Sequence, residues 1–480
     1  MANADFDLFS RASAVLQWLE ARRWRVLVVT LPLVLLLHLA FATVTIRESN
    51  LDWRPSDQLA ENYLAAAARN DPLPARTDGV RHPLWSWTVG HFYHEDREVT
   101  FHTRGKWLNT IFCLVFLAAL GIGVTRWLDP LATVNLLLLA SLGIFLVRGV
   151  YFQPEPLYYI FFFLAGILGF RILRGARWWH FLGFGVACGL AYLAKPSLLP
   201  FLLAFGAAFG VRFLFVLWRR DGGWNPWTNL LLAGVAGAIF VVMLVPLARY
   251  TSEHFGKPLF NYPQLWMWMD DFETEAYPFQ VAHPGKWELE KIPAADLPSL
   301  GWYFRRHSLA DALQRGTSGA CEVVVRFFLP EEKVRGQAFF WRTYTRHWRQ
   351  PLAHRGVYLI LLGTLCAALA WPVRREIGQG LRDPGLLSCT LLVVMATGLY
   401  IGLYGWYYPV GKGDRFMGSL WVPAAFLLCW TAFTLRRLPG ARWRDTAYLG
   451  MHALVLLSLL LQAACIAWHF SHGAFLVTRN

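Results

Sequence analysis

Long apolar runs separated by short polar segments dominate the pattern of this chain. A helix needs about 20 mainly apolar residues to cross the hydrocarbon core of a bilayer. By this criterion we expect eleven spans, at 26–46, 107–125, 131–147, 156–173, 178–194, 198–217, 228–248, 356–372, 386–404, 417–435 and 446–470. The pattern therefore predicts an all-α polytopic membrane protein.

Two of the connecting segments are long. The first covers 47–106, and the second fills the region 251–355 between the seventh and eighth expected spans. Both are rich in Trp, Tyr and Phe, as expected at a membrane interface. They divide the chain into an N-terminal membrane module, 1–250, the loop region 251–355 and a C-terminal group of spans, 356–480.

The first long loop is expected to contain two helices. Ser56 is placed to cap a helix that runs through Arg69, because the residues after it are strong helix formers. The stretch 83–94 is amphipathic and begins with Pro83, which fits the first turn of a helix. We expect this second helix to lie on the membrane surface.

The positions of the basic residues decide how the net charge of +14 is interpreted. Basic proteins bind nucleic acids, but membrane proteins also gather Lys and Arg in their cytoplasmic loops. If the N-terminus is cytoplasmic, the inner loops hold Arg126, Arg171, Arg174, Arg177, Arg219, Arg220, Arg374, Arg375, Arg382, Arg436, Arg437, Arg442 and Arg444. We therefore expect a multi-pass protein of the cell (inner) membrane that has no nucleic-acid partner.

Composition and missing motifs exclude several classes of protein. Hydrophobic residues make up 56% of the chain and charged residues 16%, whereas soluble domains carry about 25% charged residues. The seven Cys form neither a pair at metal-binding spacing nor a disulfide framework. No Walker loop, dinucleotide glycine pattern, HExxH or GxSxG motif stands in a fitting context, which argues against an ATP-driven pump and against nicotinamide chemistry.

Asp57 is the candidate catalytic residue. It is expected in the first turn of a helix, and the positive end of the helix favours an ionised carboxylate there. Such a carboxylate could accept a proton from a hydroxyl group or orient it, or it could simply cap the helix. Asp52 and Glu61 are neighbours that could share or replace this role.

Arg81 and His82 follow the expected Asp78-Gly79 turn, directly before the second helix of the loop. Arg81 could bind a phosphate with two parallel hydrogen bonds, and His82 could bond a sugar hydroxyl. The same segment could instead bind lipid headgroups.

Three further polar residues stand at expected outer ends of spans. Glu155 lies between two prolines at the membrane edge, where a carboxylate is costly unless it is paired or functional. Lys195 could extend its ammonium group to the membrane surface or meet a lipid phosphate. Arg415 lies in a Gly-containing loop that could bind phosphate, or it could pair with Asp414.

The segment after the seventh span supplies two more candidates. Trp268 could stack on the face of a sugar or lie among the headgroups, and Asp270 could hold hydroxyls or a cation. Because two adjacent carboxylates, Asp270 and Asp271, rarely form a metal site alone, a divalent metal is possible but not indicated.

The order of these features resembles the GT-C superfamily of integral membrane glycosyltransferases. The protein O-mannosyltransferases and the lipid A aminoarabinose transferase-like group are the most similar members. A first span leads to Asp57 at the head of a helix, followed by Tyr63 and an alanine run. The segment 81–85, Arg-His-Pro-Leu-Trp, is similar to the HPPL segment of the superfamily. The remaining members of the pattern are Asn109, Pro154-Glu155, Lys195-Pro196, Asn261-Tyr262, Trp268 and Arg415.

The resemblance implies a reaction on the outer face of the membrane. Such enzymes transfer a sugar from a polyprenyl-phosphate carrier to an acceptor hydroxyl, with inversion at the anomeric carbon. By analogy, Asp57 would be the general base, and Arg81, Lys195 and Arg415 would stabilise the charge developing on the leaving lipid phosphate.

By the same analogy, Glu155 and His82 would bind the sugar or support those cations. The expected partners are a polyprenyl-phosphate sugar, an unidentified hydroxyl acceptor and membrane lipids. The lipid-linked sugar is the donor, and no separate cofactor is required.

Two other classes of protein share this pattern. A lipid or polysaccharide transporter would also have many spans, and it should show repeats or broken helices near the middle of the membrane. A non-catalytic membrane assembly subunit would tolerate the loss of Asp57. The enzyme hypothesis requires Asp57, Arg81, Lys195 and Arg415 to converge at one outer cavity.

Overall fold

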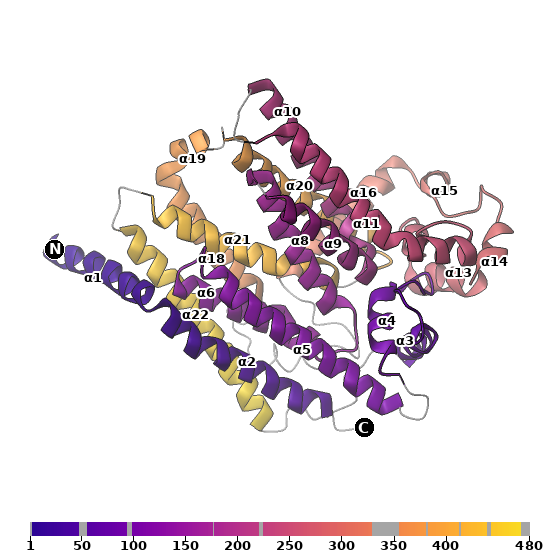
Figure 1. Cartoon of the computed structure of the whole chain (residues 1–480), viewed down its shortest axis with the longest axis horizontal. Coiled ribbons are helices and arrows are strands. Elements are labelled where there is room, and N and C mark those ends of the chain that lie inside the picture. The colour runs from indigo at the N-terminus through magenta and orange to yellow at the C-terminus, as the bar shows by residue number, and fades with distance from the viewer. Residues whose placement is uncertain are drawn as a thin grey trace.

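Helices form the described part of the chain. The computed structural model describes residues 2–47, 55–93, 98–175, 177–219, 224–328, 355–380, 383–411, 414–438 and 443–471. Within these ranges there are α-helices, short π and 3-10 segments and no strand. The long helices lie side by side in a bundle, and a group of shorter helices lies on the right of Figure 1. The expected all-α architecture is confirmed.

Apolar helices occupy all eleven segments expected to span the membrane. Nine within the described ranges are long and apolar enough to cross it. Seven are built on α2 (Arg23–Arg47), α5 (Glu98–Val124), α8 (Glu155–Gly175), α10 (Leu199–Arg219), α11 (Pro226–Phe255), α20 (Pro384–Tyr407) and α22 (Trp443–Ser471). The other two are α18 (Arg355–Ala370) together with η7 (Trp371–Val373) and α19 (Arg374–Gly380), and α21 (Trp421–Arg436) together with the end of the short helix before it. The two shorter ones are the third, formed by α6 (Pro130–Ala140), η3 (Ser141–Phe145) and α7 (Leu146–Arg148), and the fifth, α9 (Trp178–Ala194). The protein is therefore a polytopic helical membrane protein.

Several spans begin with the same N-terminal capping motif. An Asp or Asn side chain accepts a hydrogen bond from the backbone N–H three residues ahead, and a proline follows it directly. This arrangement satisfies one free N–H of the first turn and places proline where no N–H is needed. It starts α6, α11 and α20 through Asp129-Pro130, Asn225-Pro226 and Asp383-Pro384.

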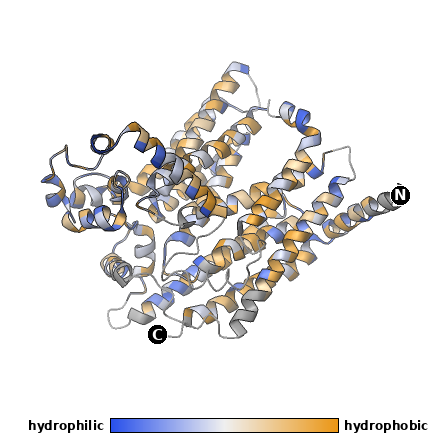
Figure 2. Ribbon diagram, turned by 180° about the vertical axis from the view of Figure 1, so that it is seen from behind, coloured by the Kyte–Doolittle hydropathy of each residue, from blue (hydrophilic) through white to orange (hydrophobic). Residues whose placement is uncertain are grey.

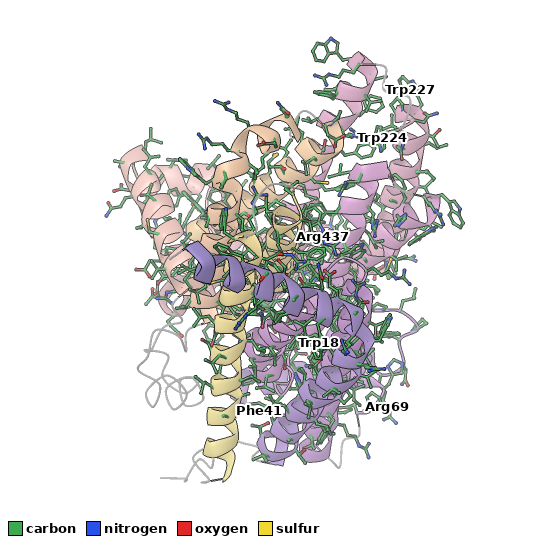
Figure 3. The ribbon with its side chains drawn as sticks, turned by 90° about the vertical axis from the view of Figure 1, so that its left-hand side faces the viewer. Trp18, Phe41, Arg69, Trp224, Trp227 and Arg437 are labelled. Atoms are coloured by element: carbon green, nitrogen blue, oxygen red, sulfur yellow. The ribbon has the colours of Figure 1, made fainter. Side chains whose placement is uncertain are left out.

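The starts of α6 and α22 and the end of α21 meet at one end of the bundle, which we call the basic end. Arg436 at the end of α21 binds Asp129 of α6 at 3.1 Å, Asp445 of α22 at 3.2 Å and Glu20 of α1 (Ala2–Ala21) at 3.4 Å. Arg437 also binds Glu20, and Figure 3, a view from the left-hand side of Figure 1, labels it. Carboxylates from three different helices therefore hold the end of α21.

The expected inner Arg residues that the structure describes fall at this basic end. Arg171 on α8 lies over Trp127 in the α5–α6 connection, and Trp224 before α11 donates a hydrogen bond to the carbonyl of Ile172. Successive spans thus alternate in direction, as the charge pattern predicted. Figure 2 shows apolar residues along the spans and hydrophilic residues concentrated towards the ends of the spans.

The first long loop contains the two expected helices at the opposite end, which we call the loop end. They are α3 (Pro55–Ala68) and α4 (Pro83–Gly90). The apolar residues of α4 pack against protein, and its expected position on the membrane surface stays a prediction. Trp85 is fully buried against the ring of Phe152, in the α7–α8 connection.

The second long loop folds around a small apolar core of its own. This core gathers Phe255 at the end of α11 with Phe260, Tyr262, Trp266 and Met269. Five short elements and one long helix follow α11 in the described chain: α12 (Pro263–Trp266), η5 (Phe272–Ala276), α13 (Tyr277–Ala282), α14 (Lys286–Glu290), α15 (Leu300–Arg306) and α16 (Leu309–Phe328). The short helix η8 (Asp414–Leu420), at the start of α21, packs against α16. Since α11 runs to Phe255 and joins this core, the loop is continuous with the seventh span.

Candidate functional site

The turn before α4 is built as the sequence predicted. The Asp78 carboxylate accepts hydrogen bonds from the backbone N–H groups of Val80 and Arg81, at 2.9 and 2.7 Å. Gly79 has φ +79°, a left-handed conformation that glycine adopts without strain. Its carbonyl accepts a hydrogen bond from the N–H of Tyr262 at 2.7 Å. The two long loops are therefore joined directly at this turn.

Arg81 is held between two carboxylates. Its Nη1 lies 2.5 Å from Oδ2 of Asp78, and its Nε lies 3.6 Å from Oε1 of Glu61 on α3. The Arg81 side chain is 17% exposed, so the guanidinium lies in a partly desolvated position. Pairing on two edges fixes its orientation, as phosphate recognition requires.

Glu61 is the least expected carboxylate of the group. It is buried, and Ser86 on α4 donates a hydrogen bond to its Oε2 at 2.9 Å. Burial raises its pKa to about 7, against the opposing effects of Arg81 and Ser86. The negative charges of Asp78 and Glu155 raise it further. A carboxyl group with this pKa is able to exchange protons near neutral pH.

His82 lies on the other side of the same segment. It is buried with its ring edge-on to Tyr192 of α9, with centroids 5.4 Å apart, and it bonds the backbone of Tyr192. Burial lowers its pKa to about 4, and the nearby ammonium of Lys195 lowers it further. Its Nδ1 has no hydrogen-bond partner among the atoms described. His82 is therefore a neutral imidazole near pH 7.

Glu155 and Lys195 form the second ion pair of the site. The Lys195 Nζ lies 3.3 Å from Oε1 of Glu155, and their side chains are 15% and 5% exposed respectively. Glu155 opens α8, where the helix dipole favours a carboxylate, and Lys195 ends α9. Asn109 on α5 donates hydrogen bonds to the carbonyls of Tyr151 and Gln153, and so positions the segment that leads to Glu155.

The two ion pairs belong to one electrostatic unit. Glu155 influences the pKa of Glu61, and Lys195 influences the pKa of His82. The structure thus brings together four of the residues singled out in the sequence, contributed by the α4 approach, α8 and α9. They are Arg81, His82, Glu155 and Lys195.

For two further candidate residues, the structure describes the position of the backbone only. Asp57 lies in the first turn of α3, as expected, and Arg415 lies in η8. Their side chains fall outside the described part of the structure. The element η8 packs on the start of α8, where Gly418 lies close to the Tyr159 hydroxyl. The segment that carries Arg415 is therefore a neighbour of the helix that Glu155 opens.

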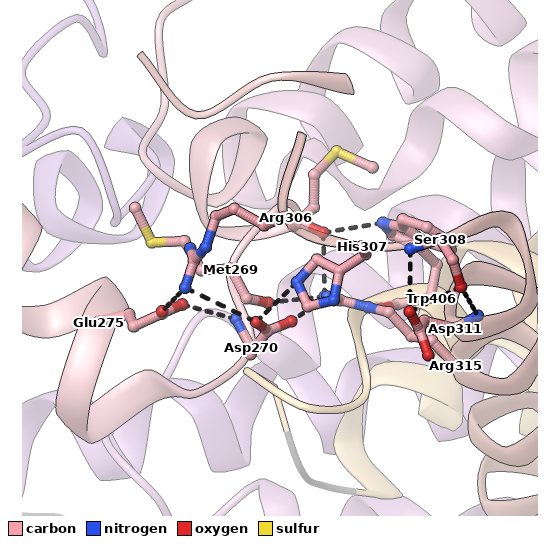
Figure 4. Close-up of polar contacts among 10 residues, drawn as sticks. Met269, Asp270, Glu275, Arg306, His307, Ser308, Asp311, Arg315 and Trp406 are labelled. Carbon is pink, nitrogen blue, oxygen red and sulfur yellow. Dashed lines mark hydrogen bonds and ion pairs between the residues drawn. The ribbon is translucent and has the colours of Figure 1, made fainter. Parts of the chain in front are cut away.

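Asp270 lies in a separate polar cluster, shown in Figure 4, and Trp268 lies beside this cluster. The Asp270 carboxylate binds Arg315 of α16 and His307, each at 3.0 Å. Trp268 packs edge-on against Trp406 near the end of α20. Both residues therefore hold the second loop against α20, and the prediction that they bind substrate stays untested.

Arg315 is an important residue that sequence analysis missed. Besides Asp270, its guanidinium donates hydrogen bonds to the backbone carbonyls of Met267, Met269 and Trp406. Its side chain is 6% exposed and lies over the ring of Trp406. The one available signal was an arginine on the face of α16 that also carries Ala312, Gly319 and Val323.

No group of three or more His, Cys, Asp or Glu side chains is arranged to hold a metal ion in the part of the chain that the structure describes. Comparison of the sequence with models of known families and with curated proteins finds no match, and comparison with solved structures finds none either.

Proposed function

We propose that the protein is a glycosyltransferase that moves a sugar from a polyprenyl-phosphate carrier to an acceptor hydroxyl on the outer face of the membrane. The observation that carries the proposal is the convergence of Arg81, His82, Glu155 and Lys195 at the loop end of the spans. These side chains supply the cations, carboxylate and neutral imidazole that a phosphate and a sugar need. They also lie at span ends, where the headgroup of a lipid-linked donor would be located.

In the proposed reaction, the acceptor oxygen attacks the anomeric carbon of the donor sugar. The bond between this carbon and the phosphate oxygen breaks, with inversion, and the proton of the acceptor passes to Asp57. Arg81 and Lys195, with Arg415, stabilise the charge on the departing lipid phosphate. Asp57 is proposed as the base because it lies in the first turn of α3, where the helix dipole favours an ionised carboxylate, one turn ahead of Glu61.

Transfer of a radiolabelled sugar tests the proposal. Membranes containing wild-type protein or Asp57→Asn are supplied with a panel of polyprenyl-phosphate sugars. We expect labelled product from the wild type and a loss of ~100-fold or more in the variant, because the acceptor proton has no base to receive it. Asp71→Asn is the matched control, since Asp71 belongs to the same loop and pairs with Arg76.

Equal product from wild type and Asp57→Asn would remove Asp57 from the mechanism and direct attention to Glu61. If no donor gives product, binding of the same lipids is measured directly. A wild-type protein that binds none of them would contradict the proposed function.

One observation favours the second candidate, a lipid or polysaccharide transporter. The third span is interrupted by the π segment η3, and Asn135 in the same span bonds the ring and the carbonyl of buried His452 at 2.9 Å. Polar contacts and irregular helices inside a membrane are typical of transport paths. Movement of a fluorescent donor lipid between leaflets of proteoliposomes, unchanged in Asp57→Asn but lost in Asn135→Leu, would favour this candidate.

A further inference from the structure

The helix α16 presents three distinct faces along its length. Its start is fixed by Ser308 and Asp311, which exchange hydrogen bonds between side chains and backbone N–H groups. One face, buried against protein, consists of Ala312, Arg315, Gly319 and Val323. The second is polar and exposed to the surroundings, and consists of Asp311, Gln314, Ser318 and Glu322.

The third face is apolar, and we call it the leucine stripe. Its residues recur at spacings of three, four or seven, which places them along one side of a helix. Leu309 and Leu313 are 68% and 61% exposed, so they are largely uncovered by the protein. The complete stripe consists of Leu309, Leu313, Ala320, Val324 and Phe327, of which the last three are half-buried.

Contacts with neighbouring helices fix the position of α16 along the direction of the spans. A Cβ added to Gly319 would lie 1.9 Å from the carbonyl oxygen of Gly405, two residues before the end of α20. The rings of Phe327 and Trp421 lie 5.9 Å apart, and Trp421 is the first residue of α21. The helix therefore lies across the ends of two membrane spans.

A third span end meets the same helix. A Cβ added to Gly356 in the first turn of α18 would lie 2.4 Å from Cα of Phe328, the last residue of α16. Between Gly319 and Phe328, α16 advances ~14 Å at 1.5 Å per residue. A helix that touches three span ends over this distance runs along the membrane plane.

We infer that α16 lies in the membrane surface, with the exposed Leu309 and Leu313 of the leucine stripe among the acyl chains of the leaflet at the loop end. At the level of Gly405, a side chain directed away from the bundle meets lipid, because α20 itself crosses the membrane. Exposed leucines beside a polar face are the pattern of helices that lie in a bilayer interface. The polar face of α16 then faces water and headgroups. This inference does not depend on the proposed function.

Spin labelling in nanodiscs that contain one copy of the protein tests the inference. Cys321, which is exposed on α16, is replaced by serine and Cys465 by alanine, while the other described cysteines are buried. A nitroxide label is then attached at Leu313→Cys or, as the matched control on the polar face, at Gln314→Cys. Collision with oxygen reports acyl chains, and collision with a water-soluble nickel complex reports water.

We expect the ratio of oxygen to nickel collisions to be severalfold higher at position 313 than at position 314. Equal ratios, with both labels open to nickel, would show that the stripe lies in water and would overturn the inference. A label at 313 that is immobile and closed to both reagents would also overturn it, because protein would then cover the stripe. Unchanged melting of both variants in detergent confirms that the labels report the native fold.

Discussion

Burial shifts the pKa of Glu61 and the pKa of His82 in opposite directions. Both side chains lie at the α3–α4 site, and in both cases the largest cause is loss of water around the charged form. The result is a carboxyl group with a pKa of about 7 and an imidazole with a pKa of about 4. Near neutral pH, His82 is therefore a neutral imidazole, while Glu61 is divided between its two protonation states.

Glu61 makes the stability of the protein depend on pH with a definite sign. Its folded-state pKa is raised from 4.5 to about 7, so the folded state keeps a proton that the unfolded state releases. The stability contributed by protonated Glu61 is complete below pH 4.5 and is lost as the pH rises to about 7. His82 has the opposite sign, because its lowered pKa removes stability as the pH falls from 6.5 to about 4.

The variant Glu61→Gln should no longer lose stability as the pH rises from 4.5 to about 7. Glutamine keeps an acceptor for Ser86 without a titrating group, so we expect the variant to gain ~2–3 kcal/mol relative to wild type between pH 5 and pH 8. Thermal unfolding in detergent at a series of pH values measures this difference. Asp71→Asn, in the surface pair with Arg76, should follow the wild-type pH dependence. Parallel curves for Glu61→Gln and wild type would contradict the assignment.

At the scale of elements, the crossing of α16 over α20 depends on two glycines. Gly319 and Gly405 face each other so closely that a Cβ on either would meet backbone atoms of the other helix within 2.6 Å. This close approach lets Arg315 reach the carbonyl of Trp406 near the end of α20. Small residues thus allow a charged side chain to bind the second loop to the bundle.

A pair of alanine substitutions on the same helix tests this crossing. Gly319→Ala must push α16 away from α20, and overpacking of this kind costs ~1–3 kcal/mol. Gly316→Ala meets open space and, by restricting the unfolded chain, should gain up to ~1 kcal/mol. Thermal midpoints of the two variants in the same detergent should therefore move in opposite directions. Similar midpoints for both would show that the crossing is not tightly packed.

At the scale of the whole molecule, the two ends of the bundle differ in chemistry. The basic end gathers arginines from several connections, and the loop end carries the Arg81–Lys195 site and both long loops. Because cytoplasmic loops are enriched in Lys and Arg, we predict that the basic end is cytoplasmic. The proposed chemistry would then take place outside the cell.

Labelling of single cysteines in intact cells tests this orientation, in the background without Cys321 and Cys465. Leu73 in the first long loop is 54% exposed and Trp178 at the start of α9 is 61% exposed. A maleimide that cannot cross membranes should label Leu73→Cys in intact cells, and Trp178→Cys only after permeabilisation. The reverse result would place the candidate site in the cytoplasm.

The fold class could be predicted because the membrane imposes a simple rule on sequence. Each span must present an apolar stretch of fixed length and satisfy its own backbone hydrogen bonds. Short-range features could also be predicted, since Asp78-Gly79 formed the expected turn and Pro83 began the expected helix. These features depend on neighbours in the sequence.

The surfaces that helices face were decided only by tertiary structure. The structure shows that α4 buries Trp85 against protein, whereas α16 leaves Leu309 and Leu313 largely exposed. Periodicity identifies an apolar face, but it does not specify whether lipid or protein covers that face.

The sequence by itself determined the all-α polytopic architecture, the positions of the apolar helices and several of the residues of the candidate site, because hydropathy and charge bias act locally along the chain. Only the tertiary structure decided that Glu61 and Arg81 pair, that Glu155 and Lys195 pair, and that Arg315 fastens the second loop. These pairs join residues from 20 to 45 positions apart. Their pairing follows from which span ends pack together, a property that no short segment of sequence contains.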